Sequence, residues 1–199
     1  MTEPIADDAP SEILDLAQAC VRYVRDALGF ELDFTPETLP VLDHYLRQSV
    51  RGSGPEAIEL MARVAGAYFG ELVRRRLSGT RWAQAEDDAR RQRLEFERFF
   101  LCFNPIGAAL EAIAGEPSEG WHAHFQVLDD ARIAVSAVLE AGAEVPEEDF
   151  FTLAMRLETL EQVADLVSGI EAARGEIRSF GPEVYRALFE PPEAGDAPS

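Results

Sequence analysis

The stretch from Pro55 to Leu77, PEAIELMARVAGAYFGELVRRRL, decides how this chain folds. Its apolar residues recur every three or four positions and extend around most of the circumference, which predicts one long helix buried among neighbouring elements. The small residues Ala62, Gly66 and Gly70 stand four apart and form a groove without side chains. Because each glycine costs about 1 kcal/mol relative to alanine inside a helix, we expect a neighbouring helix to pack closely against this groove.

The residues on either side of this stretch predict the rest of the fold. Apolar periodicity indicates helices before it, and strands interleaved with helices after Gly79. The expected helices begin at Ser11, Thr35, Asn104, Asp129 or Asp130, Thr159 and Pro182. The expected strands cover residues 80–83, 94–103 (bent near Arg98) and 121–128. Residues 150–157 fit a strand or the start of a helix, and we favour a strand because Thr159 resembles a new N-cap. No regular βαβ series is present, so the sequence predicts an α+β fold in which a helical N-terminal half packs on a small antiparallel sheet with interleaved helices.

One expected helix directs specific side chains to the core. In the segment that begins at Asp129 or Asp130, helical spacing predicts that one group of apolar residues faces inward. That group consists of Ile133, Ala134, Ala137 and Val138.

Length and composition indicate a single globular domain. The chain has 199 residues, 47% of them hydrophobic, which is enough to build a core. We expect one domain over residues 11–189 between disordered tails at 1–10 and 190–199, which are polar, acidic and rich in proline. No apolar run approaches the ~20 residues of a membrane span, and the N-terminus has no secretory signal pattern. Cys20 and Cys102 lie among apolar residues, so we expect buried thiols in a cytoplasmic protein. The lack of a long apolar run leads us to expect that the protein does not bind membranes.

The charge of the chain is strongly negative and unevenly distributed. A net charge of −19 argues against general binding to nucleic acid or to anionic membranes. Residues 44–98 nevertheless hold eleven arginines and eight acidic residues, a net charge of +3, and the remainder carries −22. The basic segment could receive an anion or an acidic partner, or it could pair with the acidic remainder of its own chain.

Two stretches resemble small bacterial proteins of uncharacterised families that carry a domain of unknown function. They are LDFTPETLPVLDHYL at residues 32–46 and GAYFGELVRRRLSGTRW at residues 66–82. The matching residues are Leu32, Asp33, Phe34, Thr35, Pro36, Glu37, Leu39, Leu42 and Asp43 in the first stretch, and Gly66, Ala67, Tyr68, Gly70, Glu71, Arg74, Arg75 and Trp82 in the second. The resemblance implies a shared helical core and transfers no activity.

Glu71 is the strongest candidate for a functional side chain because it places a carboxylate in an apolar helix. A buried carboxylate must be paired with a cation or take up a proton. In a functional site, Glu71 would act as a base or ligand-binding acid in a pocket with Arg74, Arg75 and Trp82. In a structural role, it would form an ion pair with Arg75 or another arginine.

Other polar residues give weaker patterns. Asp33 and Asp43 could form an acidic cluster with Glu71, or could cap helices and face solvent. His122 and His124 stand two apart on a predicted strand and could both reach one metal ion, with only His44 or a distant carboxylate to complete the site. The chain has no Cys-x-x-Cys, His-Glu-x-x-His, Gly-x-Ser-x-Gly or phosphate-binding glycine loop. The sequence therefore assigns no catalytic residue, metal or cofactor.

These patterns leave two function classes. The first is a non-catalytic interaction or accessory protein of the bacterial cytoplasm that works through a protein partner or as a homo-oligomer. The second is a small-molecule binder or enzyme with a pocket around Glu71 and its arginines. A closed core with Glu71 paired inside it would favour the first class, and a deep cavity at Glu71 would favour the second.

Overall fold

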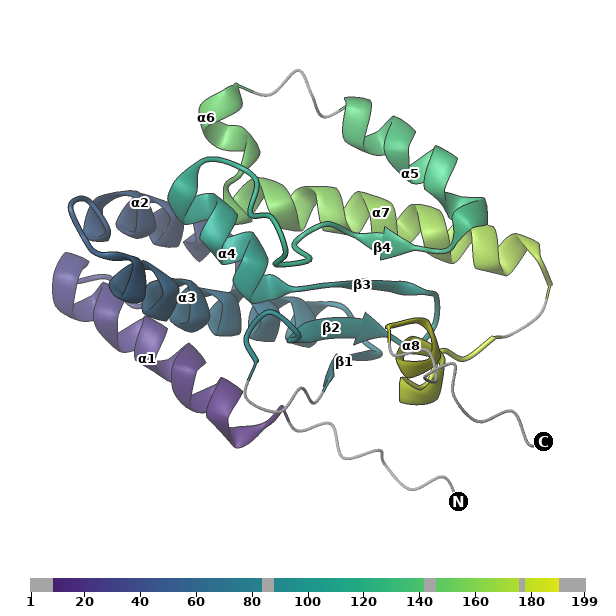
Figure 1. Ribbon diagram of the computed structural model, residues 1–199, viewed down its shortest axis with the longest axis horizontal. Coiled ribbons are helices and arrows are strands. Elements are labelled where there is room, and N and C mark those ends of the chain that lie inside the picture. The colour runs from purple at the N-terminus through teal and green to yellow at the C-terminus, as the bar shows by residue number, and fades with distance from the viewer. Residues whose placement is uncertain (1–8, 84–87, 142–145, 176–177, 190–199) are drawn as a thin grey trace, which may run out of the picture.

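A computed structural model of the chain describes residues 9–83, 88–141, 146–175 and 178–189 (Figure 1). The helices are α1 (Ser11–Leu28), α2 (Leu39–Ser49), α3 (Pro55–Arg76), α4 (Pro105–Ala114), α5 (Asp129–Ala141), α6 (Glu147–Phe150), α7 (Leu153–Ala173) and α8 (Pro182–Phe189), with a 3-10 turn η1 (Pro36–Thr38) before α2. The strands β1 (Thr80–Ala83), β2 (Arg93–Phe96), β3 (Leu101–Phe103) and β4 (Gln126–Val127) form one antiparallel sheet in the order β1-β2-β3-β4. The predicted α+β fold with a helical N-terminal half is confirmed.

The predicted domain covers residues 11–189, and the described ranges begin at residue 9 and end at residue 189. Of the two expected tails, only Ala9 and Pro10 are described, and Ala9 is buried in the core. None of the helices in the described ranges combines the length and apolar composition that a membrane-spanning helix needs.

Helix α3 is the central helix of the fold, as its sequence predicts. It packs between α1 and α4 (Figure 1). A Cβ atom at Gly66 would lie 2.5 Å from the Cα atom of Ile106 in α4, so the predicted close approach of a helix is confirmed there. At Gly70 the neighbour is instead the indole ring of Trp82 from β1, which a Cβ atom would overlap. The groove is therefore filled by the backbone of α4 at Gly66 and by the Trp82 side chain of β1 at Gly70.

The two faces of the sheet differ in chemistry. Side chains at alternate positions join the main core, which also contains residues of α3 and α7; they are Trp82, Leu94, Phe96, Leu101 and Phe103. The strand register places Arg81, Glu95, Cys102 and Gln126 opposite one another across the four strands. Because side chains alternate between faces, this polar row lies on the face away from the main core.

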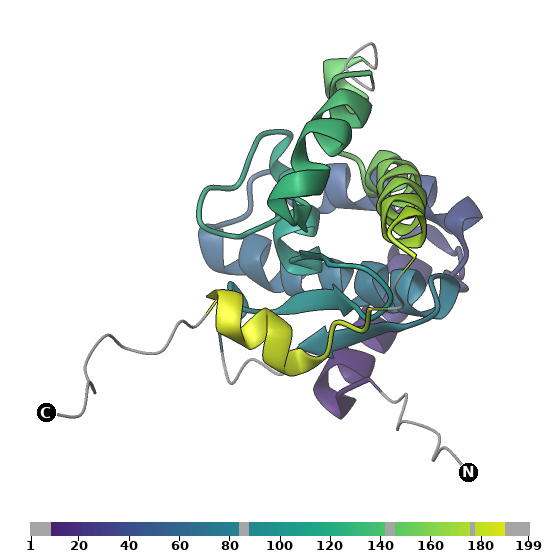
Figure 2. The same ribbon diagram turned by 90° about the vertical axis from the view of Figure 1, so that its right-hand side faces the viewer.

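Helix α8 covers part of that polar face (Figure 2). The Tyr185 hydroxyl accepts hydrogen bonds from the backbone N–H groups of Phe96 and Leu101, each at 3.2 Å. It also lies 2.6 Å from the Phe96 carbonyl oxygen, to which it donates. One side chain thus satisfies backbone groups of both β2 and β3 and fixes α8 on the hairpin that they form.

Two strand predictions are wrong in their extent. Residues 94–103 do not form one bent strand: β2 and β3 pair with each other, and the chain turns between them. Residues 121–125 are not a strand, and only Gln126–Val127 pairs with β3. The turn was not predicted because it contains Phe99 and Phe100, which are buried and have the residue type expected of a strand.

The strand predicted over residues 150–157 is also wrong, because most of it belongs to α7. Thr152 is the N-cap of this helix, and its hydroxyl accepts from the Met155 N–H at 3.2 Å. Thr159, which we expected to cap a later helix, lies inside α7 and donates its hydroxyl proton to the Met155 carbonyl at 2.9 Å.

Helix α5 is rotated relative to its predicted orientation. Ala131 and Val135 are buried, whereas Ile133 is 85% exposed and Ala137 is exposed. The other two residues predicted to face inward, Ala134 and Val138, are half-buried, and Val138 packs against the main core. The sequence pattern failed here because α5 packs chiefly against α7 alone and lies at the periphery of the molecule in both views (Figures 1 and 2). A helix with one neighbour needs only a narrow buried stripe.

Candidate functional site

Glu71 is completely buried and fully engaged by neighbouring donors. Its Oε1 atom accepts from Arg74 Nε at 2.8 Å and from Trp82 Nε1 at 2.9 Å. Its Oε2 atom accepts from Arg74 Nη2 at 3.1 Å and lies 3.6 Å from Arg75 Nε. The structure therefore brings all four predicted site residues together, with the carboxylate of Glu71 at their centre.

The surroundings of Glu71 explain how this cluster forms. Gly70 leaves room for the Trp82 ring, which reaches from β1 across the end of α3 to donate to the carboxylate. The Arg75 guanidinium lies 3.8 Å from the centre of the Phe34 ring, so this arginine also covers the cluster. None of Glu71, Arg75 and Trp82 lines the cleft beside β2 and β3 or the groove between α5 and α8.

The pairing of Glu71 recurs at other buried glutamates of this chain. Glu95 accepts from Arg81 at 2.8 Å and from Arg93 at 2.9 Å, and Glu111 is paired with Arg156. A buried carboxylate with arginine partners is thus a repeated way of joining elements here. The repetition favours the structural role of Glu71.

The two aspartates do not form an acidic cluster. Asp33 is exposed and accepts from the backbone N–H and hydroxyl of Thr35 at 3.0 and 2.7 Å. Asp43 is buried in α2 and accepts from the N–H groups of Leu153 and Ala154 at 2.8 and 3.1 Å. Asp43 therefore satisfies the first donors of α7 from another helix, next to the N-cap Thr152.

Asp43 is expected to give stability a specific pH dependence. Burial raises the pKa of its carboxyl from 3.8 to about 6, against the opposing effect of its two N–H donors. Since the folded pKa is the higher one, the folded state binds more protons between these values, and the stability contributed by Asp43 falls as pH rises. The free energy of unfolding of the wild type minus that of Asp43→Asn should fall by about 2 kcal/mol between pH 4 and pH 7. A difference that grows with pH would show that the two N–H groups hold the carboxylate ionised.

The predicted metal pair is not formed as the sequence suggested. His122 and His124 are exposed residues of a loop, and His122 has a left-handed backbone with φ of 51°. His44 lies in α2, where its Nε2 atom is 2.8 Å from Gln48 Nε2. Within the described residues, no three His, Cys, Asp or Glu side chains are placed to share a metal ion.

A cationic cleft of about 170 Å³ lies on the polar side of the sheet, and the sequence reasoning missed it. We call it the arginine cleft; it is lined by Arg90, Arg91, Gln92, Arg93, Cys102, Phe103, Asn104, His122, Gln126 and Phe189. The only signal in the sequence was the positive balance of residues 44–98, since the segment before β2 looks like an ordinary polar loop.

The thiol at this cleft is unreactive. Cys102 is buried, and burial raises its pKa to about 12, although the charge of Arg93 acts in the opposite direction. Nucleophilic chemistry requires a thiolate at neutral pH. Cys102 is therefore not placed to act as a thiolate nucleophile at neutral pH.

A larger apolar groove of about 560 Å³ lies between α5, β4 and α8. We call it the α5–α8 groove; it is lined by Phe100, Phe125, Gln126, Val127, Leu128, Asp129, Arg132, Val135, Ser136, Leu139, Leu188 and Phe189. Most of these side chains are apolar, and two of them, Leu139 and Leu188, are 39% and 55% exposed. Large exposed apolar side chains around a concave surface are typical of binding sites.

Comparison with known proteins adds no relative. No protein-family model matches the chain, and no curated protein and no solved structure is significantly similar to it.

Proposed function

We propose that this chain is a non-catalytic accessory protein of the cytoplasm that binds an apolar segment of another protein in the α5–α8 groove. The observation that carries the proposal is the size and apolar lining of that groove. The free, buried state of Cys20 and Cys102 is in keeping with a reducing compartment.

The exposed residues of α5 support this proposal. Ile133 is 85% exposed on a helix that contacts the body chiefly through α7, and Leu139 and Leu188 flank the groove. Protein interfaces derive most of their affinity from a few apolar or aromatic side chains that enter such concave surfaces. An apolar segment of a partner in the groove would bury Leu139 and Leu188.

Ligand binding around Glu71 receives less support. The carboxylate has no exposed surface, and its oxygens already accept from two residues and lie near a third. A ligand would have to displace these donors at the cost of leaving buried polar groups unpaired. A structural role for Glu71 agrees better with its contacts.

The proposal predicts that groove variants lose binding to a selected peptide. A random peptide library displayed on phage, panned against the full chain, should yield peptides with apolar side chains. The affinity of the best peptide should fall by about tenfold or more in Leu139→Glu and Leu188→Glu, because a charge replaces a contact worth about one buried leucine.

Leu60→Glu is the matched control, because Leu60 is 52% exposed near the start of α3 and does not line the groove. Its effect on affinity should stay below about twofold. The proposal is wrong if no peptide is enriched, or if the selected peptides bind both groove variants as tightly as the wild type. Analytical ultracentrifugation should find a monomer; a dimer that Leu188→Glu dissociates would instead identify a second copy as the occupant.

A further inference from the structure

We propose that the partner segment carries a carboxylate next to its apolar residues, and that the arginine cleft binds this carboxylate while the α5–α8 groove binds the apolar residues. This inference rests on the proposed function and specifies the chemistry of the partner.

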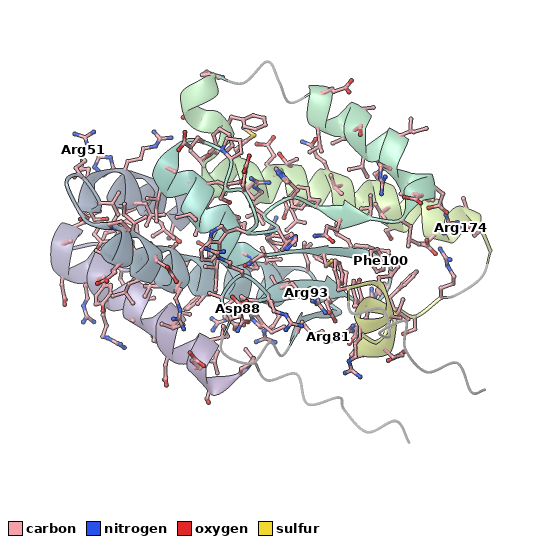
Figure 3. The ribbon with its side chains drawn as sticks, in the orientation of Figure 1. Arg51, Arg81, Asp88, Arg93, Phe100 and Arg174 are labelled. Carbon is pink, nitrogen blue, oxygen red and sulfur yellow. The ribbon has the colours of Figure 1, made fainter. Side chains whose placement is uncertain are left out.

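The two hollows adjoin each other. Gln126 of β4 and Phe189 at the end of α8 line both the arginine cleft and the α5–α8 groove. A short bound segment can therefore occupy both hollows at once. Figure 3 labels Arg93 and Phe100 in the region of the sheet beside α8, and Phe100 lines the groove.

The cleft concentrates positive charge in a strongly acidic chain. Three arginines line it although the net charge of the protein is −19. Within the described residues, no acidic side chain lies within 4 Å of the Arg90 guanidinium, whereas Arg93 is paired with the buried Glu95 through its Nε atom. Arg93 is thus paired inside the segment 44–98 itself and not with the acidic remainder, whereas Arg90 forms no ion pair among the described residues.

The arginines are also held in place before any ligand binds. Asn104, the N-cap of α4, donates its side-chain amide to the carbonyls of Ala89 and Arg90 at 2.9 and 3.2 Å. The Arg90 guanidinium lies 5.3 Å from the centre of the Trp121 ring, and that of Arg93 lies 4.5 Å from the centre of the Phe189 ring. Aromatic contacts leave the guanidinium edges available as donors, and ordering them in advance lowers the entropy cost of binding.

A carboxylate is the ligand that suits these donors. The planar guanidinium matches a carboxylate with two parallel hydrogen bonds, which are stronger than bonds between neutral groups. A cleft of about 170 Å³ has room for an acidic side chain but not for a large cofactor. The partner segment is therefore an acidic and apolar peptide.

The selected peptides test this inference. We expect Asp and Glu to be enriched in them relative to the library, and we expect the Asp→Asn or Glu→Gln version of the best peptide to bind about tenfold more weakly. The double variant Arg90→Gln/Arg91→Gln should lose a similar factor for the acidic peptide. It should bind the amide version of the peptide as the wild type does, because the two changes remove the same interaction.

The control removes the same charge at distant exposed sites, with Arg22→Gln/Arg51→Gln. Arg22 lies in α1, and Figure 3 places Arg51 at the left edge of the molecule, away from Arg93 near its centre. This variant should change affinity by less than about twofold at physiological salt, where charges beyond the Debye length are screened.

The outcomes separate the two proposals. Peptides that depend on Leu188 but carry no excess of acidic residues, and that bind Arg90→Gln/Arg91→Gln normally, would overturn the carboxylate inference and leave the proposed function standing. Peptides that bind independently of Leu139 and Leu188 would overturn both. If the double arginine variant does not fold, the loss of affinity on converting the peptide's own acid to the amide decides the question.

Discussion

Gly66→Ala should destabilise the protein by about 2–3 kcal/mol, although alanine is the better helix former. The new Cβ atom would lie 2.5 Å from Ile106 Cα, 2.8 Å from Ile106 N and 2.9 Å from the Pro105 carbonyl oxygen. All three atoms belong to the backbone of α4, so no side chain can rotate away and the two helices must separate. Urea unfolding followed by circular dichroism would measure the loss as a lower transition midpoint.

Gly169→Ala is the matched control within the same protein. Gly169 lies inside α7, and its added Cβ atom would meet no atom within 4 Å. This variant should gain up to about 1 kcal/mol, since only the helix propensity changes. If Gly66→Ala is as stable as the wild type, the close packing of α3 on α4 is wrong.

The α3–α4 contact is the part of the fold that the sequence predicts best. The spacing of Ala62, Gly66 and Gly70 is a local pattern, and its cost in helix propensity demands a close neighbour. The N-cap Asn104 with Pro105 is local as well, and the structure confirms it, since Asn104 accepts from the N–H groups of Ile106 and Gly107. Patterns of this kind are complete within a few residues, so a single sequence reveals them.

Long-range contacts decide what the sequence failed to predict. The start of α7 depends on Asp43, more than 100 residues earlier in the chain, so a local pattern could not distinguish it from a strand. Tyr185 likewise satisfies backbone groups of a hairpin more than 80 residues earlier. The pairing of a buried Glu71 with arginine was predictable because both groups lie on one helix, but the donor from Trp82 was not assigned to it.

The arginine cleft could not be predicted from the sequence for the same reason. Its lining comes from the loop before β2, the start of α4, the loop before β4 and the end of α8. No spacing of residues in the sequence brings these segments together. The net charge of residues 44–98 indicated a basic surface, but only the antiparallel register of the sheet places Glu95, Cys102 and Gln126 opposite one another, with Arg93 two residues before Glu95 on the same strand.

Glu71→Gln is expected to cost about 3 kcal/mol or more in unfolding free energy. The amide keeps an acceptor for Trp82 Nε1 but places N–H groups against Arg74, whose side chain is only 14% exposed. The largely buried Arg74 guanidinium thus loses the anionic partner that Glu71 supplies, where little water can replace it. Urea unfolding at neutral pH would measure the change.

Glu59→Gln is the control on the exposed surface of the same helix, and it should change stability by less than about 0.5 kcal/mol. A double-mutant cycle with Arg74→Gln then attributes the loss to the ion pair. Once Glu71 is neutral, removing the Arg74 charge should cost less than it does in the wild type, because the attraction it supplied is already gone. A fully stable Glu71→Gln protein would contradict the structural role and return Glu71 to the list of candidate ligand-binding residues.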